Sequence, residues 1–230
     1  MINSSIFLML REFDILKSLS QKELEEMTKS ATLKRVEKNR NIYEPGDESL
    51  YVYLVQKGSI KLGINASCGK ILIKDIVYEN SLFGENVFVD DKTRKEFAKT
   101  MTDTSVIRIP IEVFRTMVEE NGAFANDVMG VVLHRLQLLE ERMQSFVFKK
   151  AKKRIVDFIL KTGQLRGIKI GMEEILINHG MSHKEIAYLT DTSRQTVARV
   201  LGELKREDLI HFSARKPNKI LIRNMMNLAY

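Results

Sequence analysis

A repeat of apolar residues between positions 125 and 146 constrains the fold of this chain more than any other feature. The apolar residues are spaced four and three positions apart in alternation: Ala125, Met129, Val132, Leu136, Leu139, Met143 and Phe146. An average spacing of 3.5 residues keeps one stripe of a helix facing a partner helix. The sequence therefore predicts a long helix that pairs with a second copy of the chain, through an interface made of Met129, Val132, Leu136, Leu139, Met143 and Phe146.

The same helix carries a second apolar stripe of Val128, Val131 and Leu138. A helix that simply packs on its own domain is the alternative explanation of the repeat. We expect both arrangements, with the second stripe on the preceding domain and the heptad stripe on a second subunit.

Short β-rich runs separated by turn residues occupy positions 33 to 110. The runs are Tyr51–Val55, Ser59–Ile64, Lys70–Val77 and Ser105–Ile109. Strands at such regular spacing predict a small antiparallel β-roll. Before it, Ser20 and Glu23 form a capping-box pattern at the start of a helix. After the long helix we expect a helix at Ile155–Leu160 that ends at Gly163, and strands at 167–171 and 175–178. The fold class is α+β.

The charge is concentrated at one end of the chain. The net charge is +7, and residues 149–230 hold 17 Lys and Arg against 8 Asp and Glu. A basic segment joined to a near-neutral one predicts that only the C-terminal part meets a polyanion. The first 14 residues contain neither a secretory signal nor a membrane span, so we expect a cytoplasmic protein without a membrane partner.

A helix-turn-helix pattern lies at residues 182–201. Ser182 and Glu185 form a second capping box, and Ser193 is the expected N-cap of a second helix. Ile186, Leu189, Val197, Val200, Leu201 and Leu204 form the expected buried faces. Two short helices with a three-residue connection are typical of DNA-binding proteins, whose second helix enters the major groove.

The exposed face of that second helix carries the candidate DNA contacts. Arg194, Gln195 and Arg199 are the expected base readers, because Arg binds guanine and Gln binds adenine through paired hydrogen bonds. Phosphate contacts are expected from Ser182, Ser193 and Thr196, and from a basic hairpin tip at residues 215–219 with Lys216 and Lys219. The tip resembles the wing of a winged helix. The alternative is an ordinary helical hairpin with a charged outer face.

With these features taken together, the chain resembles the Crp/Fnr family of bacterial regulators. The resemblance rests on Glu44–Asp47 with residues 53–62, on Phe83-Gly84-Glu85, on the heptad helix, and on residues 192–201. It implies a cyclic-nucleotide-binding-like β-roll that senses an effector, a dimerisation helix, and a winged helix-turn-helix that reads an inverted repeat. We expect these parts at residues 1–110, 111–148 and 149–230. Many members carry Glu where Gln195 stands, so the operator sequence does not carry over.

The identity of the effector stays open. The resemblance places Gly84, Glu85 and Arg94 in the effector pocket. Nucleotide-binding relatives have Arg-Ser or Arg-Thr at the phosphate position, whereas Arg94 is followed by Lys95. An alignment backward from Ala98 puts Lys95 or Glu96 there instead. A cyclic nucleotide is therefore disfavoured.

The residues that bind metals and haem give little support for a cofactor. Cys68 is the only cysteine, which disfavours an iron–sulfur cluster, and whether it is redox-active stays open. No metal site is expected, since the four histidines lie outside the roll. Haem bound at His134 remains an open alternative.

The predicted function is a homodimeric, sequence-specific DNA-binding transcription regulator gated by an effector at the β-roll and dimer helix. RNA polymerase is a candidate partner. The alternative is a cyclic-nucleotide-binding signalling module that acts through protein partners. Arg194 and Arg199 on the recognition face argue against that alternative. No catalytic residues are expected, because the roll lacks the His/Glu cluster of a barrel enzyme.

Overall fold

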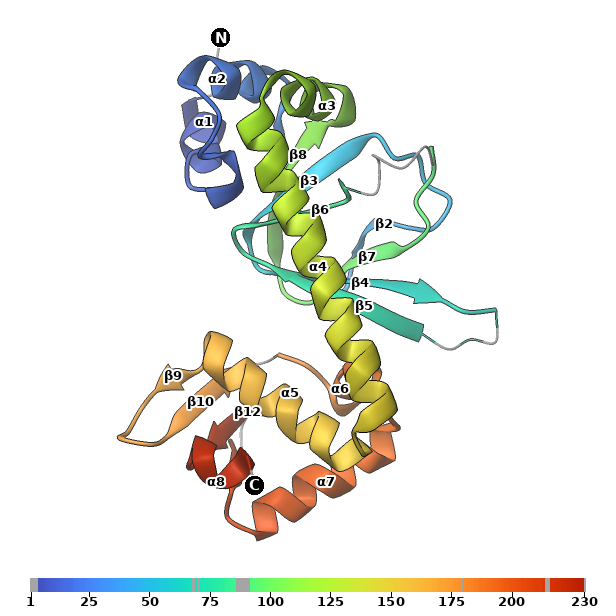
Figure 1. The fold of residues 1–230 in the computed structure, drawn as a ribbon, viewed down its shortest axis with the longest axis vertical. Coiled ribbons are helices and arrows are strands. Elements are labelled where there is room, and N and C mark those ends of the chain that lie inside the picture. Colours follow the sequence, from blue (N-terminus) through green and yellow to red (C-terminus); the bar gives the residue numbers. More distant parts are fainter. Residues whose placement is uncertain are drawn as a thin grey trace. The chain divides into compact units, whose positions relative to one another are not determined.

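The chain folds into two compact units. The computed structural model describes residues 4–67, 69, 71–85, 92–178, 180–213 and 216–229. One unit spans Met1–Leu138 and the other Leu139–Tyr230, so the boundary between them falls inside helix α4 (Gly122–Phe148). Figure 1 shows the elements of each unit.

Helices precede and follow the β-strands of the first unit. It opens with α1 (Ser4–Leu10), a 3₁₀ helix at Asp14–Leu16, and α2 (Gln21–Ser30). Its strands are β1 (Thr32–Val36), β2 (Asn41–Tyr43), β3 (Tyr51–Lys57), β4 (Ser59–Asn65), β5 (Ile71–Tyr78), β6 (Ser81–Phe83), β7 (Phe97–Thr100) and β8 (Thr104–Pro110). Helix α3 (Ile111–Glu120) and the first part of α4 complete it.

Two antiparallel four-stranded sheets form the β-roll, in the orders β1-β8-β3-β6 and β2-β7-β4-β5. Successive side chains of a strand point to opposite faces of its sheet. In β3, Tyr53 and Val55 join the core between the sheets, while Val52 and Leu54 join the core under the helices. Both faces of β3 are buried, which explains why its apolar run does not alternate with polar residues. The predicted β-roll is confirmed.

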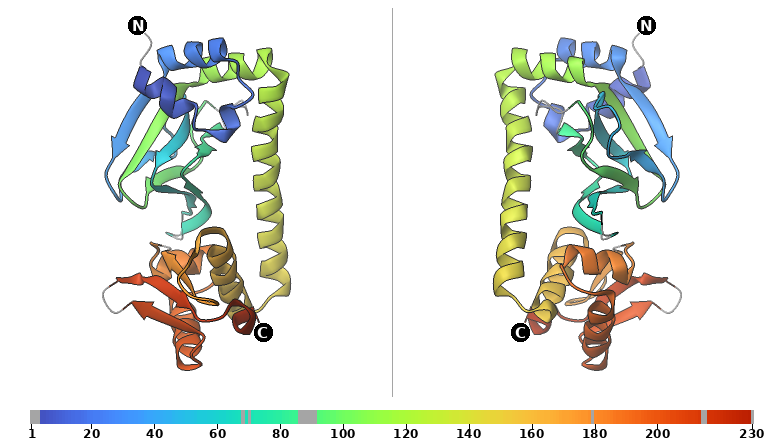
Figure 2. Two further views of the ribbon diagram at one scale, coloured as in Figure 1. Left: turned by 90° about the vertical axis from the view of Figure 1, so that its left-hand side faces the viewer. Right: turned by 90° about the vertical axis from the view of Figure 1, so that its right-hand side faces the viewer.

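The start of α4 packs on this first unit. Phe124 of α4 meets Phe114 of α3 edge to face, with ring centroids 5.2 Å apart, and both side chains are fully buried. Val128 belongs to the same core and Val131 packs against it. The prediction that the second stripe packs on the preceding domain is confirmed for these two residues. Figure 2 shows α4 as one uninterrupted helix.

Helices and a small sheet make up the second unit. After the last turns of α4 come α5 (Ala151–Arg166), β9 (Ile168–Lys169), β10 (Ile175–Asn178), α6 (His183–Leu189), α7 (Arg194–Arg206), β11 (Ile210–Ser213), β12 (Lys216–Ile222) and α8 (Met225–Ala229). The antiparallel sheet has the order β11-β12-β10-β9. The hairpin of β11 and β12 projects from the helices of this unit (Figure 2).

Two local predictions in this unit are wrong. Helix α5 does not end at Gly163 but continues to Arg166. Gly163 is buried there, and a Cβ on it would lie 3.1 Å from Cδ1 of Ile222. Glycine at this position therefore permits the close approach of β12. The hairpin tip is also shorter than predicted, because β12 begins at Lys216 and pairs Lys219 with Asn178 of β10.

Candidate nucleic-acid interface and effector pocket

The first helix of the predicted helix-turn-helix begins with the predicted capping box. The hydroxyl of Ser182 accepts from the backbone N–H of Glu185 at 3.3 Å, and the Glu185 carboxylate accepts from the backbone N–H of Ser182 at 2.9 Å. These contacts satisfy two N–H groups that a helix start otherwise leaves unpaired. The Ser182 hydroxyl also donates to that carboxylate at 2.9 Å. A phosphate contact from Ser182 would therefore require this hydroxyl to turn.

The second helix, α7, buries one face and exposes the other. Ser193 caps it, accepting from the backbone N–H of Thr196 at 3.0 Å. The Thr196 hydroxyl lies 2.8 Å from that of Ser193. The predicted inner face is confirmed, with these residues buried: Val197, Val200, Leu201 and Leu204. The side chains of Arg194, Gln195 and Arg199 are exposed. The helix therefore presents the three candidate base readers to solvent.

Two arginines with no role expected from the sequence, Arg142 and Arg154, hold the turn between these helices. Asp191 has a φ of +49°, a left-handed conformation that is costly for a non-glycine residue. Arg142 contacts the Asp191 carboxylate through Nε at 3.0 Å and Nη2 at 2.8 Å. Arg154 of α5 donates to the carbonyls of Thr190 and Asp191, both at 2.8 Å. These charged donors fix a turn whose conformation is otherwise unfavourable.

The basic hairpin is only partly described. Lys219 is half-buried in β12. Lys216 starts that strand, and its side chain, like Arg215 and Cys68, lies outside the described residues.

The candidate effector residue Arg94 is buried in the β-roll and is only 4% exposed. Its guanidinium donates to the carbonyl oxygens of Gly84, at 2.9 Å, and Tyr51, and its central carbon lies 4.4 Å from the centre of the Tyr43 ring. Gly84 has a φ of +83°, and a Cβ on it would lie 3.1 Å from Nη1 of Arg94. The structure thus brings Gly84 and Arg94 together, with Arg94 bound to backbone carbonyls.

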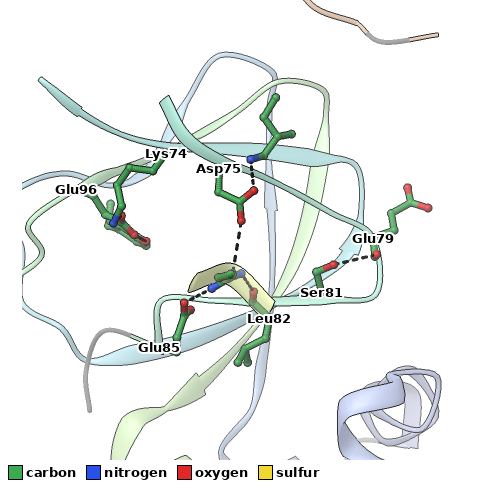
Figure 3. A network of polar contacts seen from close by, with 10 residues as sticks. Lys74, Asp75, Glu79, Ser81, Leu82, Glu85 and Glu96 are labelled. Atoms are coloured by element: carbon green, nitrogen blue, oxygen red, sulfur yellow. Dashed lines mark hydrogen bonds and ion pairs between the residues drawn. The ribbon is translucent and has the colours of Figure 1, made fainter. Parts of the chain in front are cut away.

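Glu85, the third candidate effector residue, pairs with Arg135 of α4. Arg135 donates through Nη1 to Glu85 and through Nη2 to the carbonyl of Leu82, and its Nε lies 3.5 Å from the carboxylate of Asp75. Figure 3 shows the two carboxylates, with Asp75 on β5 and Glu85 just after β6. Burial alone would lower the pKa of Arg135, but the Glu85 and Asp75 charges raise it on balance. Arg135 therefore stays charged and ties α4 to the roll.

A second buried pair lies nearby in the roll. Glu96 is 3% exposed and accepts from Lys74 Nζ at 2.6 Å and from the Tyr43 hydroxyl at 3.2 Å. Burial, with the charge of Glu96, raises the pKa of Tyr43 well above its ordinary value, so the phenol keeps its proton. Glu96 and Glu85 are thus each paired with a cation, while Oε2 of Glu85 is buried without a hydrogen-bond partner among the described residues.

The heptad stripe of α4 is uncovered in the single chain. The six predicted interface residues are between 41% and 70% exposed: Met129, Val132, Leu136, Leu139, Met143 and Phe146. A continuous apolar stripe of this kind on a long helix is typical of a contact surface.

Two further features are absent from the described residues. No group of three or more His, Cys, Asp or Glu side chains among them is placed to hold a metal ion. None of their helices is both long and apolar enough to cross a membrane.

Comparison with known proteins identifies both units. A model of the cyclic nucleotide-binding domain matches residues 33–121, and a model of the Crp-like helix-turn-helix domain matches residues 153–230. The chain is 28% identical to the global nitrogen regulator of Synechococcus elongatus over 180 residues, covering 77% of this chain and 81% of that protein. It is 25% identical to the anaerobic regulatory protein of Bacillus subtilis over 218 residues, covering 94% and 90%.

The solved structure of FixK2 from Bradyrhizobium japonicum has the same fold. It superposes with a TM-score of 0.75 at 22% identity, covering 86% of this chain and 95% of that one. A β-roll of the cyclic-nucleotide-binding type followed by a helix-turn-helix defines a class of DNA-binding transcription regulators. The chain belongs to the Crp/Fnr family of that class.

Proposed function

We propose that this protein is a homodimeric transcription regulator, not an enzyme, that reads an inverted-repeat operator in the cytoplasm. The exposed row of Arg194, Gln195 and Arg199 on α7 carries the proposal, since the opposite face of that helix is buried. These side chains have the chemistry that reads guanine and adenine edges in the major groove. Phosphate contacts are proposed for five further residues: Ser182, Ser193, Thr196, Lys216 and Lys219.

The uncovered stripe on α4 supports a dimer. Two recognition helices must lie about 34 Å apart to enter successive major grooves on one face of DNA. Pairing of two α4 helices would join two copies of the chain and so set that spacing. RNA polymerase is a candidate partner of the DNA-bound dimer, because relatives of this chain are transcriptional regulators by name.

The effector is proposed to act where Glu85 meets Arg135. A ligand that competes for either side chain would change how α4 is held and would shift the population of DNA-binding dimers. Two described cations of this region already have acidic partners, since Lys74 pairs with Glu96 and Arg135 with Glu85. Arg94 donates to carbonyl oxygens, but its buried Nε has no hydrogen-bond partner among the described residues. The pairing of Lys74 and Arg135 disfavours a phosphate-bearing effector such as a cyclic nucleotide, because a phosphate would have to displace one of those carboxylates or be bound by Arg94 alone.

Selection of bound oligonucleotides from a random pool tests the proposal, with the purified chain alone, with cyclic AMP and with haem. We expect a two-fold symmetric site, binding that weakens steeply with salt, and no response to cyclic AMP. A site without two-fold symmetry would contradict the dimer. Salt-insensitive binding without a preferred sequence, together with affinity for cyclic AMP, would favour the protein-binding signalling module instead.

A further inference from the structure

The side chain of the proposed base reader Arg199 is hydrogen-bonded to another side chain of α7. Its Nη1 donates to Oε1 of Glu203, one turn later in α7, at 2.5 Å. The Arg199 side chain is 63% exposed, whereas that of Glu203 is only 22% exposed. The carboxylate is therefore the sheltered and more fixed member of the pair, and the arginine is the member that faces solvent.

Glu203 is held from its other side by α5. Its Oε2 lies 3.6 Å from Nζ of Lys152, and the same ammonium lies 3.8 Å from Oε1 of Glu207. The hydrogen bond from Arg199, with the nearby positive charges, lowers the pKa of Glu203. Near pH 7 the residue is therefore a carboxylate placed between a lysine of α5 and an arginine of the recognition face.

The contact leaves one edge of the guanidinium available. Guanine is read by two parallel hydrogen bonds from a planar fork of donors. Because Nη1 of Arg199 is bound to Glu203, the donors on the opposite edge are Nε and Nη2. Within the described part of the chain, neither of these atoms makes a hydrogen bond or ion pair.

We propose that Glu203 is a positioning residue that sets the base specificity of Arg199. It holds the guanidinium so that the Nε and Nη2 edge meets a guanine, and it competes with phosphates for the same side chain. Both effects favour operator DNA over random DNA. Lys152 fixes Glu203 in turn, which links a residue of α5 to the choice of base.

This inference depends on the proposed DNA reading by α7, and the test separates the two. The measurement is the affinity of full-length Glu203→Gln for two duplexes of equal length and composition, over a range of salt. One duplex is the site selected by the wild-type protein and the other is its scrambled sequence. Gln keeps the size and one acceptor of Glu but loses the charge that orients Arg199.

We expect the ratio of operator to scrambled affinity to fall about tenfold, within the range that one bidentate base contact contributes. Affinity for the scrambled duplex should stay equal or increase, because a competing carboxylate is gone. In a repeated selection, the preference should relax at the same base pair that Arg199→Ala relaxes. In the Arg199→Ala background, Glu203→Gln should lower the ratio no further.

Glu207→Gln is the matched control, because it removes the same charge beside Lys152 from a residue that does not contact Arg199. Its ratio should equal that of the wild type. An unchanged ratio in Glu203→Gln, or an equal loss of affinity for both duplexes, would overturn the inference while leaving DNA reading intact. A wild-type protein that selects no sequence would instead overturn the proposed function.

Discussion

The guanidinium of Arg142 in α4 donates two hydrogen bonds to the carboxylate of Asp191 in the helix-turn-helix, at 3.0 and 2.8 Å. Its Nη2 also donates to the carbonyl of Tyr188 at 2.7 Å. The last turns of the proposed dimer helix therefore touch the turn that sets the angle between α6 and α7. Within the second unit, a change in α4 has a direct contact through which to reach the recognition helix.

Arg142→Ala is expected to destabilise the second unit by about 1–3 kcal/mol, because it leaves a half-buried carboxylate and a carbonyl without their donor. Chemical denaturation followed by circular dichroism measures this loss, and operator affinity should fall with it. Arg142→Lys should recover only part of both, since an ammonium lacks the planar two-donor fork. Wild-type stability in both variants would contradict this account.

Leu136→Glu should convert the protein to a monomer at micromolar concentration. A dimer interface would bury the new carboxylate without a partner, at a cost of several kcal/mol. Size-exclusion chromatography with light scattering measures the mass. Gln137→Glu is the control, since Gln137 is exposed and outside the heptad stripe. A Leu136→Glu protein that stays dimeric would place the interface elsewhere.

Gln195→Glu should change the base preference at one position of each half-site from adenine toward cytosine, since a carboxylate accepts from the cytosine amino group. The discrimination involved is about 1–3 kcal/mol per base pair. Selection from a random pool reports the change, and Gln195→Ala should lose the preference without gaining another. If all three proteins select the same site, Gln195 does not read a base.

Glu85→Gln should weaken the attachment of α4 to the β-roll. Arg135 would keep Asp75, at 3.5 Å, and the Leu82 carbonyl, but lose its closest charged partner. We expect a loss of about 1–3 kcal/mol in stability and faster hydrogen exchange of amides in α4. Asp75→Asn should have a smaller effect because its contact with Arg135 is longer. The reverse order of effects would show that Asp75 is the main anchor.

Local sequence signals predicted much of the fold. Both capping boxes, at Ser20 and Ser182, form as expected, because each depends only on residues three positions apart. Four strands of the roll, β3, β4, β5 and β8, and the buried face of α7 also follow from local patterns. Strands β1, β2, β6 and β7 were not predicted. The prediction that α5 ends at Gly163 was wrong because it used a common signal, since many helices end at a glycine. Here it serves a contact with Ile222, 59 positions later, which no local pattern reveals.

The contacts that organise the candidate sites were harder to foresee. Neither Arg135 nor Arg142 had an expected role from the sequence alone. Their partners Glu85 and Asp191 lie 50 and 49 positions away in sequence, so only the folded chain brings them together. Glu203, in contrast, follows Arg199 by four residues, and that spacing is itself the signal of a helical ion pair.

The boundary inside α4 has a practical consequence for dissecting the protein. A fragment cut at residue 149, where the basic segment begins, would discard Arg142 and leave Asp191 to hold its left-handed turn without that partner. It would also lose Glu141, which pairs with Lys161 of α5 at 3.1 Å. A minimal DNA-reading fragment should therefore start near Leu139, so that it keeps the end of the long helix and the contacts of Glu141 and Arg142.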